Sequence, residues 1–133
     1  MEPPHRFSPS GKRALQIVVT LLALIPITVG AAGMLGGPAS VGASDPPRDL
    51  DSHFRYLSGI FMALGFVFWS CVPNVEQKGA LFRVASALVV AGGLGRLLAY
   101  ATQGPPSGLH VAGLVMELIV VPGLAVWQAR VAT

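Results

Sequence analysis

Five ionisable side chains in or beside the apolar stretches of the sequence could carry out chemistry. They are one glutamate, two arginines and two histidines: Glu117, Arg96, Arg55, His53 and His110. A guanidinium can hold a carboxylate through two parallel hydrogen bonds while it stays charged, and a carboxylate with an imidazole can exchange protons with a substrate. These residue types could therefore form an ion pair, bind an anionic group or carry out acid–base chemistry.

Other kinds of chemistry lack the motifs that they need. The sequence has no CxxC, HExxH, GxGxxG or P-loop spacing, and its single cysteine, Cys71, lies inside an apolar block. His53, His110 and Glu117 come from separate places without the spacing of metal ligands. We therefore predict no metal and no cofactor. The basic residues are too scattered for a nucleic-acid-binding patch, so we expect no nucleic-acid partner.

The composition shows what surrounds these side chains. Of the 133 residues, 53% are apolar and 11% are charged, whereas a soluble domain carries about 25% charged residues because its surface faces water. The apolar residues also fall in long blocks and not in short amphipathic stripes. We expect an all-α integral membrane protein, a single domain in which four transmembrane helices pack as an antiparallel bundle.

Four apolar runs are long enough to cross a bilayer as helices. We expect these helices at about 14–35, 53–72, 80–101 and 109–128, within one membrane domain over residues 14–133. Residues 1–13 are expected to form a flexible cytoplasmic tail. Asp51 or Ser52 is expected to be the N-cap of the second helix.

The first apolar run has an alternative interpretation as a secretory signal peptide. Basic residues precede it, and Val41-Gly42-Ala43 resembles a cleavage site with small residues. The run is longer than the core of a signal peptide, which favours a retained anchor.

The basic residues near the helix ends predict the orientation in the membrane. If the N-terminus is inside, six basic residues lie on the cytoplasmic side: Arg6, Lys12, Arg13, Lys78, Arg83 and Arg130. The loop on the opposite side holds Arg48 together with three aspartates. We therefore expect a multi-pass protein of the cell membrane, the inner membrane in a bacterium, with both termini in the cytoplasm.

Depth along the helices selects a first partner for Glu117. This residue lies eight positions after Leu109, hence roughly 12 Å from the outer end of its helix. Arg96 lies about five positions before the outer end of the third helix, hence roughly 8 Å deep. A charge at such depth costs about 2.5–3.5 kcal/mol on insertion scales, so each should seek a partner. Both side chains are long enough to bridge the offset.

The other three ionisable residues are expected on the same side of the membrane. His110 begins the fourth helix, and His53 and Arg55 begin the second. Counting by three and four places His110 on the helical face of Glu117, a face made of His110, Gly113, Leu114, Glu117 and Val121. We expect all five ionisable residues to converge in the outer half of the bundle, with Arg96–Glu117 as the first pairing and Arg55–Glu117 as the alternative.

Small residues are expected to let the helices approach closely, since lipid gives helices no hydrophobic reason to associate. The third helix carries a ladder at every fourth position, with two glycines beside it: Ala87, Ala91, Gly95 and Ala99, then Gly92 and Gly93. Gly33 and Gly37 end the first helix. We assign these residues to packing and not to ligand binding.

Three segments of the sequence resemble a known family. SHFRYLSGIFMALG at 52–65, GGLGRLLA at 92–99 and the helix at 110–128 with its Glu117 are similar to a bacterial family of small membrane proteins, domain of unknown function 4345. The resemblance covers the last three helices, whereas the first helix is similar only in its general apolar character. It implies a four-helix membrane protein without assigned activity or established catalytic residues. The positions it implies in this chain are His53, Arg55, Arg96 and Glu117.

Three functions fit these observations. The chain could bind a lipid or another amphiphile between its helices, with the anionic group meeting Arg55 and Arg96 while Glu117 orients them. It could be a membrane isomerase that uses Glu117 and a histidine as acid and base, whereas a reductase would need paired cysteines or a cofactor motif. It could also be a subunit of an oligomeric transporter with Glu117 as proton site.

A purely structural interpretation is that Arg96 and Glu117 form a buried ion pair that only fixes the register of two helices. The sequence leaves open whether the chain is an enzyme and leans against it, and none of the three functions has a signal that excludes the others. The expected partners are the lipid bilayer, a lipid or hydrophobic small molecule, and other copies of the chain in a homo-oligomer.

Overall fold

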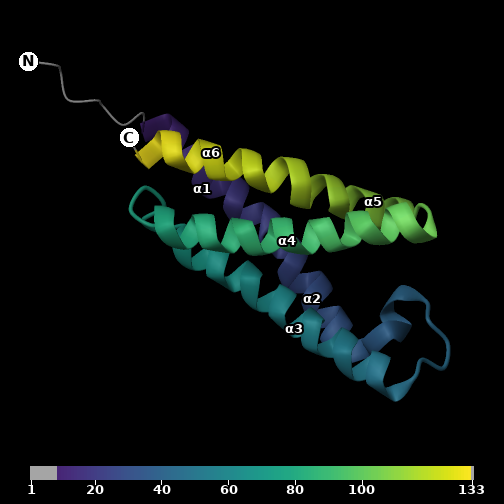
Figure 1. Ribbon diagram of the computed structural model, residues 1–133. Helices are drawn as coiled ribbons and strands as arrows, with labels where there is room; N and C mark the ends of the chain where they lie inside the picture. Colours follow the sequence, from purple (N-terminus) through teal and green to yellow (C-terminus); the bar gives the residue numbers. More distant parts are fainter. Residues whose placement is uncertain (1–8, 133) are drawn as a thin grey trace, which may run out of the picture. The chain divides into compact units, whose positions relative to one another are not determined.

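The computed structural model describes residues 9–132 of the chain, and these residues form helices joined by turns, with no strand among them (Figure 1). The helices in chain order are α1 Pro9–Leu22, α2 Leu24–Gly36, the 3-10 helix η1 Gly37–Val41, α3 Arg48–Cys71, α4 Gly79–Gln103, α5 Gly108–Val115, the π-helix η2 Met116–Val120 and α6 Val121–Ala132.

Four helical segments are long and apolar enough to cross a membrane. They are Gly11–Val41, Arg48–Cys71, Gly79–Gln103 and Gly108–Ala132. The predicted all-α fold with four membrane-spanning helices is therefore confirmed, and the chain is a multi-pass membrane protein.

Two helices begin five residues earlier than the sequence suggested. Helix α1 begins at Pro9, so residues 9–13 of the expected tail are helical, while residues 1–8, with Arg6, lie outside the described residues. Proline is tolerated in the first turn of a helix because its missing N–H would have no partner there. The expected cap at Asp51 or Ser52 is wrong, because α3 begins at Arg48 after Pro47. Asp51 instead lies in the first turn, where a carboxylate favours the positive end of the helix dipole.

The first membrane span is interrupted by one residue. Ala23 separates α1 from α2 while its N–H still donates to the Val19 carbonyl at 2.9 Å. Pro26, three residues further on, has no N–H for the carbonyl of Leu22, so the helical ladder is locally broken. The apolar run continues past this point because a membrane helix can keep a proline when its neighbours pack around it.

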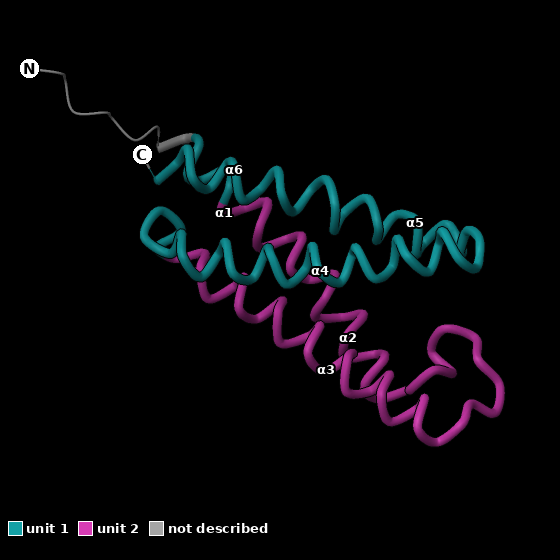
Figure 2. The backbone as a smooth tube through the Cα atoms, viewed as in Figure 1, with its two compact units in different colours: residues 1–15, 74–133 teal, residues 16–73 magenta. Residues whose placement is uncertain are grey.

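The chain forms two compact units (Figure 2). Residues 16–73 make unit 2, in which α2 and α3 run antiparallel, and their backbones approach where glycines leave room. A methyl group at Gly30 would lie 2.5 Å from the Met62 nitrogen, and one at Gly65 would lie 3.0 Å from the Ala23 carbonyl oxygen. At one end of the unit, the Trp69 indole N–H donates to the Thr20 carbonyl at 3.0 Å.

Residues 1–15 and 74–133 make unit 1, in which α4 runs antiparallel to the segment formed by α5, η2 and α6. At one end of the pair, the fully buried Gln128 donates to the Val75 carbonyl at 2.8 Å. Near the middle, a methyl group at Gly93 would lie 2.8 Å from Cβ of Glu117. Glycine at this position therefore lets α4 approach the turn of η2.

The predicted ladder on the third helix is not the packing face of α4. Its four members, Ala87, Ala91, Gly95 and Ala99, are exposed, and a methyl group at Gly92 or Gly95 would meet nothing within 4 Å. The buried stripe consists of Phe82, Ala85, Ser86 and Gly93. Arg96 follows Gly93 by three positions and so continues this stripe. The ladder lies on another side of the helix.

Candidate functional site

Arg96 and Glu117 form a bidentate ion pair inside unit 1. Arg96 Nε donates to Glu117 Oε2 at 3.0 Å, and Nη2 donates to Oε1 at 3.1 Å. The two side chains are unequally covered, since 33% of the Arg96 side chain and 10% of the Glu117 side chain are exposed. The first pairing predicted from depth is therefore the one that the structure contains. The carboxylate is enclosed, and the guanidinium forms the accessible part of the pair.

His110 completes a triad with the ion pair. Its Nδ1 lies 2.8 Å from Arg96 Nη1, and a guanidinium has donors only, so Nδ1 accepts the bond with its lone pair. A methyl group at Gly113 would lie 3.8 Å from Cζ of Arg96, so the guanidinium rests against α5 beside this glycine. His110, Gly113 and Glu117 thus line one face, as the counting by three and four predicted. We call Arg96, His110 and Glu117 the outer triad, after the half of the bundle in which the sequence predicts them.

Glu117 lies in a turn that the sequence did not reveal. The π-helix η2 spans Met116–Val120, and the N–H of Val121 donates to the carbonyl of Met116, five positions earlier. Pro122 has no N–H, so it cannot donate to the carbonyl of Glu117, five positions earlier. Single π-turns are frequent at functional sites. The only signal in the sequence is Pro122, which predicts a local break but not its type.

Arg55 has a different set of partners, all in unit 2. Its Nε donates to Asp51 Oδ2 at 2.8 Å, and its Nη1 donates to the carbonyl oxygens of Met34 and Leu35 at 2.9 and 2.8 Å. These carbonyls belong to the last turn of α2, where helical partners are missing and a cation is favoured. Arg55 therefore caps α2 and links its end to α3.

Gly37 makes this cap sterically feasible. Its φ of +62° is strained for residues with a side chain, and a methyl group there would lie 2.6 Å from Asp51 Oδ1 and 2.7 Å from Arg55 Nη2. The sequence did contain a signal for the Asp51–Arg55 pair, because the two residues are four positions apart on one helix. The alternative pairing of Arg55 with Glu117 left this nearer carboxylate out of account.

The structure thus brings together three of the five candidate residues. Arg96, His110 and Glu117 are in contact, whereas His53 is an exposed residue of α3 and Arg55 is engaged at the end of α2. The convergence of all five stays a prediction. Within residues 9–132, no group of three or more histidine, cysteine, aspartate or glutamate side chains could hold a metal ion.

One charged pair includes a residue outside the membrane-spanning segments, Glu76 in the link before α4. Lys12 Nζ lies 3.0 Å from Glu76 Oε2, which ties the start of α1 to the link before α4. The pKa of Glu76 is lowered by a hydrogen bond from its own backbone N–H and, next, by the bond from Lys12. This pair contributes to unit 1 at the end opposite the outer triad.

Comparison with known proteins gives one match. The model of a family described as "Domain of unknown function (DUF4345)" matches residues 14–128. The match begins inside α1 and ends inside α6, so it also includes the first helix, which the resemblance of shorter segments had left out. No curated protein and no solved structure matches the chain.

Proposed function

The chain belongs to the DUF4345 family, and since that description carries no activity, we propose from the geometry that this membrane protein binds a lipid or another amphiphile at its outer triad. The polar head of the ligand contacts Arg96 and His110, and Glu117 orients the guanidinium. Arg55, which the sequence offered as a second contact, has no part in this proposal because its guanidinium caps α2.

The observation that carries the proposal is the exposed third of the Arg96 side chain. A guanidinium has five N–H bonds, and Glu117 and His110 accept three of them. Two N–H bonds therefore remain, together with one nitrogen of the imidazole. Arg96 lies seven positions before Gln103 at the end of α4, hence about 10 Å along the helix. Polar groups at such depth are costly unless they have partners, and an amphiphile can bring its head to this level.

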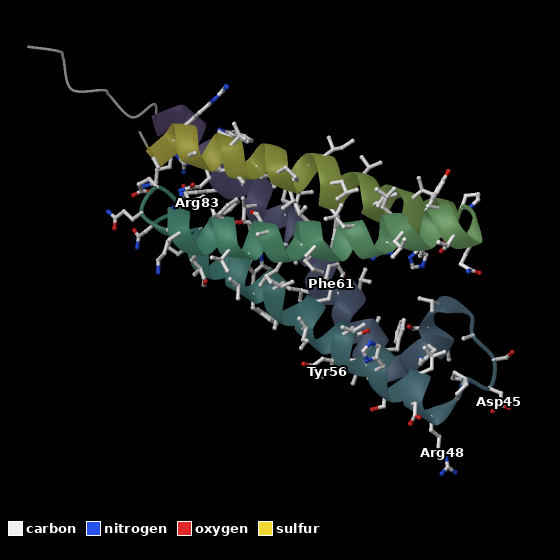
Figure 3. All side chains as sticks on the ribbon, viewed as in Figure 1. Asp45, Arg48, Tyr56, Phe61 and Arg83 are labelled. Atoms are coloured by element: carbon white, nitrogen blue, oxygen red, sulfur yellow. The ribbon has the colours of Figure 1, made fainter. Side chains whose placement is uncertain are left out.

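The orientation that we propose puts the termini in the cytoplasm and the protein in the cell membrane. One end of unit 1 carries Lys12, Arg13, Lys78, Arg83 and Arg130, and Arg83 lies near the start of α4 (Figure 3). The link from η1 to α3 instead carries Asp45, and α3 begins with Arg48 (Figure 3), followed in its first turn by Asp49 and Asp51. Loops rich in lysine and arginine stay on the cytoplasmic side, so the outer triad belongs to the outer half of the membrane.

The bidentate pair disfavours the isomerase alternative. Both carboxylate oxygens of Glu117 already accept bonds from Arg96, which leaves this residue poorly placed to take a proton from a substrate. The transporter alternative requires an oligomer and a change in the protonation of Glu117, and it becomes the better hypothesis if no amphiphile is found.

The test is mass spectrometry of the lipids and metabolites that copurify with the protein from native membranes. The variant R96Q/E117Q keeps a hydrogen-bonded pair but removes the guanidinium, and Arg83→Ala, at the other end of α4, is the control. We expect one amphiphile class with wild type and R83A that is missing from a folded R96Q/E117Q protein. The same lipid profile in all three proteins would refute the proposal.

A further inference from the structure

The hydrogen bond between Arg96 and His110 fixes where the imidazole carries its proton. Because Nδ1 accepts the bond from Arg96 Nη1 at 2.8 Å, the ring is neutral and its single proton is on Nε2. Arg96 and Glu117 cancel each other's charge, so the triad as a whole is neutral in this state. It offers N–H donors to a ligand but no net charge.

We propose that protonation of His110 converts the outer triad from a neutral donor site into a cationic site that selects amphiphiles with an anionic phosphate or carboxylate head. This regulation rests on the proposed binding function. A proton on Nδ1 would face an N–H of Arg96 across 2.8 Å, and two cationic donors cannot keep that contact. The contact opens, and both groups then need an acceptor. An anionic head placed between them takes over the role of the Nδ1 lone pair.

The surroundings of His110 in unit 1 support a change of one full charge. The charged group that faces it from α4 is Arg96. The charged group on the same face in η2 is Glu117, and each of its two carboxylate oxygens already accepts a hydrogen bond from Arg96. Tyr100, one turn beyond Arg96 on α4, is 39% exposed.

The first measurement tests the position of the proton. The chain has three histidines, His5, His53 and His110, and nitrogen NMR of histidine-labelled protein in phosphatidylcholine nanodiscs separates protonated from bare ring nitrogens. The variant His110→Gln assigns the signals, and its amide oxygen can still accept the bond from Arg96. We expect His110 to carry its proton on Nε2 at about pH 7.5. A proton on Nδ1 at this pH would overturn the inference.

The second measurement tests the selection of charge. Native mass spectrometry follows binding of phosphatidylglycerol, whose phosphodiester keeps its charge over the range, with phosphatidylcholine as the uncharged comparison. Between about pH 7.5 and 5.5 we expect phosphatidylglycerol to bind on the order of tenfold more tightly to wild type, and H110Q to show no gain. The soluble headgroup glycerophosphoglycerol is the third ligand. A gain with the headgroup alone would identify a soluble anion and overturn the amphiphile as ligand.

The outcomes separate this inference from the function on which it rests. Binding that depends on Arg96 but does not change with pH, or that gains equally in H110Q, would overturn the switch and leave the binding function intact. Absence of binding at every pH, in wild type that is folded, would overturn both. A gain confined to wild type, together with the loss of the neutral imidazole signal over the same pH range, would support the switch.

Discussion

Removal of the Arg96 guanidinium should destabilise unit 1 through the carboxylate that it leaves behind. Glu117 is 7% exposed and receives two hydrogen bonds from Arg96. Breaking a buried ion pair by losing one partner costs about 3–5 kcal/mol. Because the Arg96 side chain is one-third exposed, we expect R96A to cost about 2–3 kcal/mol.

A double-mutant cycle isolates the pair from the rest of the side chain. E117A leaves a guanidinium that is partly exposed, so we expect it to cost less than R96A, about 1–2 kcal/mol. R96A/E117A leaves no unpaired charge and should cost no more than R96A alone. The coupling energy should therefore be about 1–2 kcal/mol.

Reversible unfolding in mixed detergent micelles gives the four free energies of the cycle. Arg83→Ala, an exposed arginine at the other end of α4, is the matched control and should stay within about 0.5 kcal/mol of wild type. Additive effects, with a coupling energy below about 0.5 kcal/mol, would refute the reasoning, because the two charges would then not depend on each other in the membrane.

Three further predictions concern the packing, the cap of α2 and the link before α4. Gly93→Ala should destabilise unit 1 by about 1–3 kcal/mol, because the added methyl group would overlap Cβ of Glu117. At Gly92 an added methyl group would contact no atom within 4 Å, so Gly92→Ala should stabilise the helix by up to about 1 kcal/mol in the same unfolding assay. Arg55→Gln should cost about 1 kcal/mol through the lost cap and leave the bound amphiphile unchanged in mass spectrometry. Because the pKa of Glu76 is lowered in the folded chain, its carboxylate adds to the free energy of unfolding at pH values above its pKa in the unfolded chain, and this contribution is lost as pH falls below about 4. Glu76→Gln should therefore make the free energy of unfolding fall less steeply in acid. An unchanged fall would show that the pair with Lys12 contributes nothing.

The class of the fold and the Arg96–Glu117 ion pair could be predicted because each follows from one dominant contribution to the free energy: the transfer of apolar residues out of water, and the cost of an unpaired charge in the membrane. Long apolar blocks must leave water, and a buried charge must find a partner at its own depth. Depth and helical periodicity were therefore sufficient to pair Arg96 with Glu117 and to add His110 to the same face. The match of the family model confirms the resemblance found in short segments.

The details that escaped prediction depend on competition between partners of similar strength. Arg55 could meet Glu117 or Asp51, and the carboxylate four positions away on the same helix won, together with two carbonyls that no sequence pattern marks. On α4, a ladder of small residues and a mixed stripe through Gly93 were both able to pack, and the buried stripe is the one through Gly93. The π-turn at Glu117 depends on Pro122 and on packing against α4, of which the sequence shows only the proline.

The two intramembrane arginines show how partners determine what a guanidinium can do. Arg55 donates to a carboxylate and to two backbone carbonyls. Backbone carbonyls keep their lone pairs at any physiological pH, so this arrangement is fixed and serves as a cap. Arg96 also holds a carboxylate, but its third acceptor is an imidazole lone pair, which a proton can occupy. Of these two sites, only the one at Arg96 has a neutral acceptor that a change in pH can withdraw, and this difference is why we place ligand binding and its regulation there.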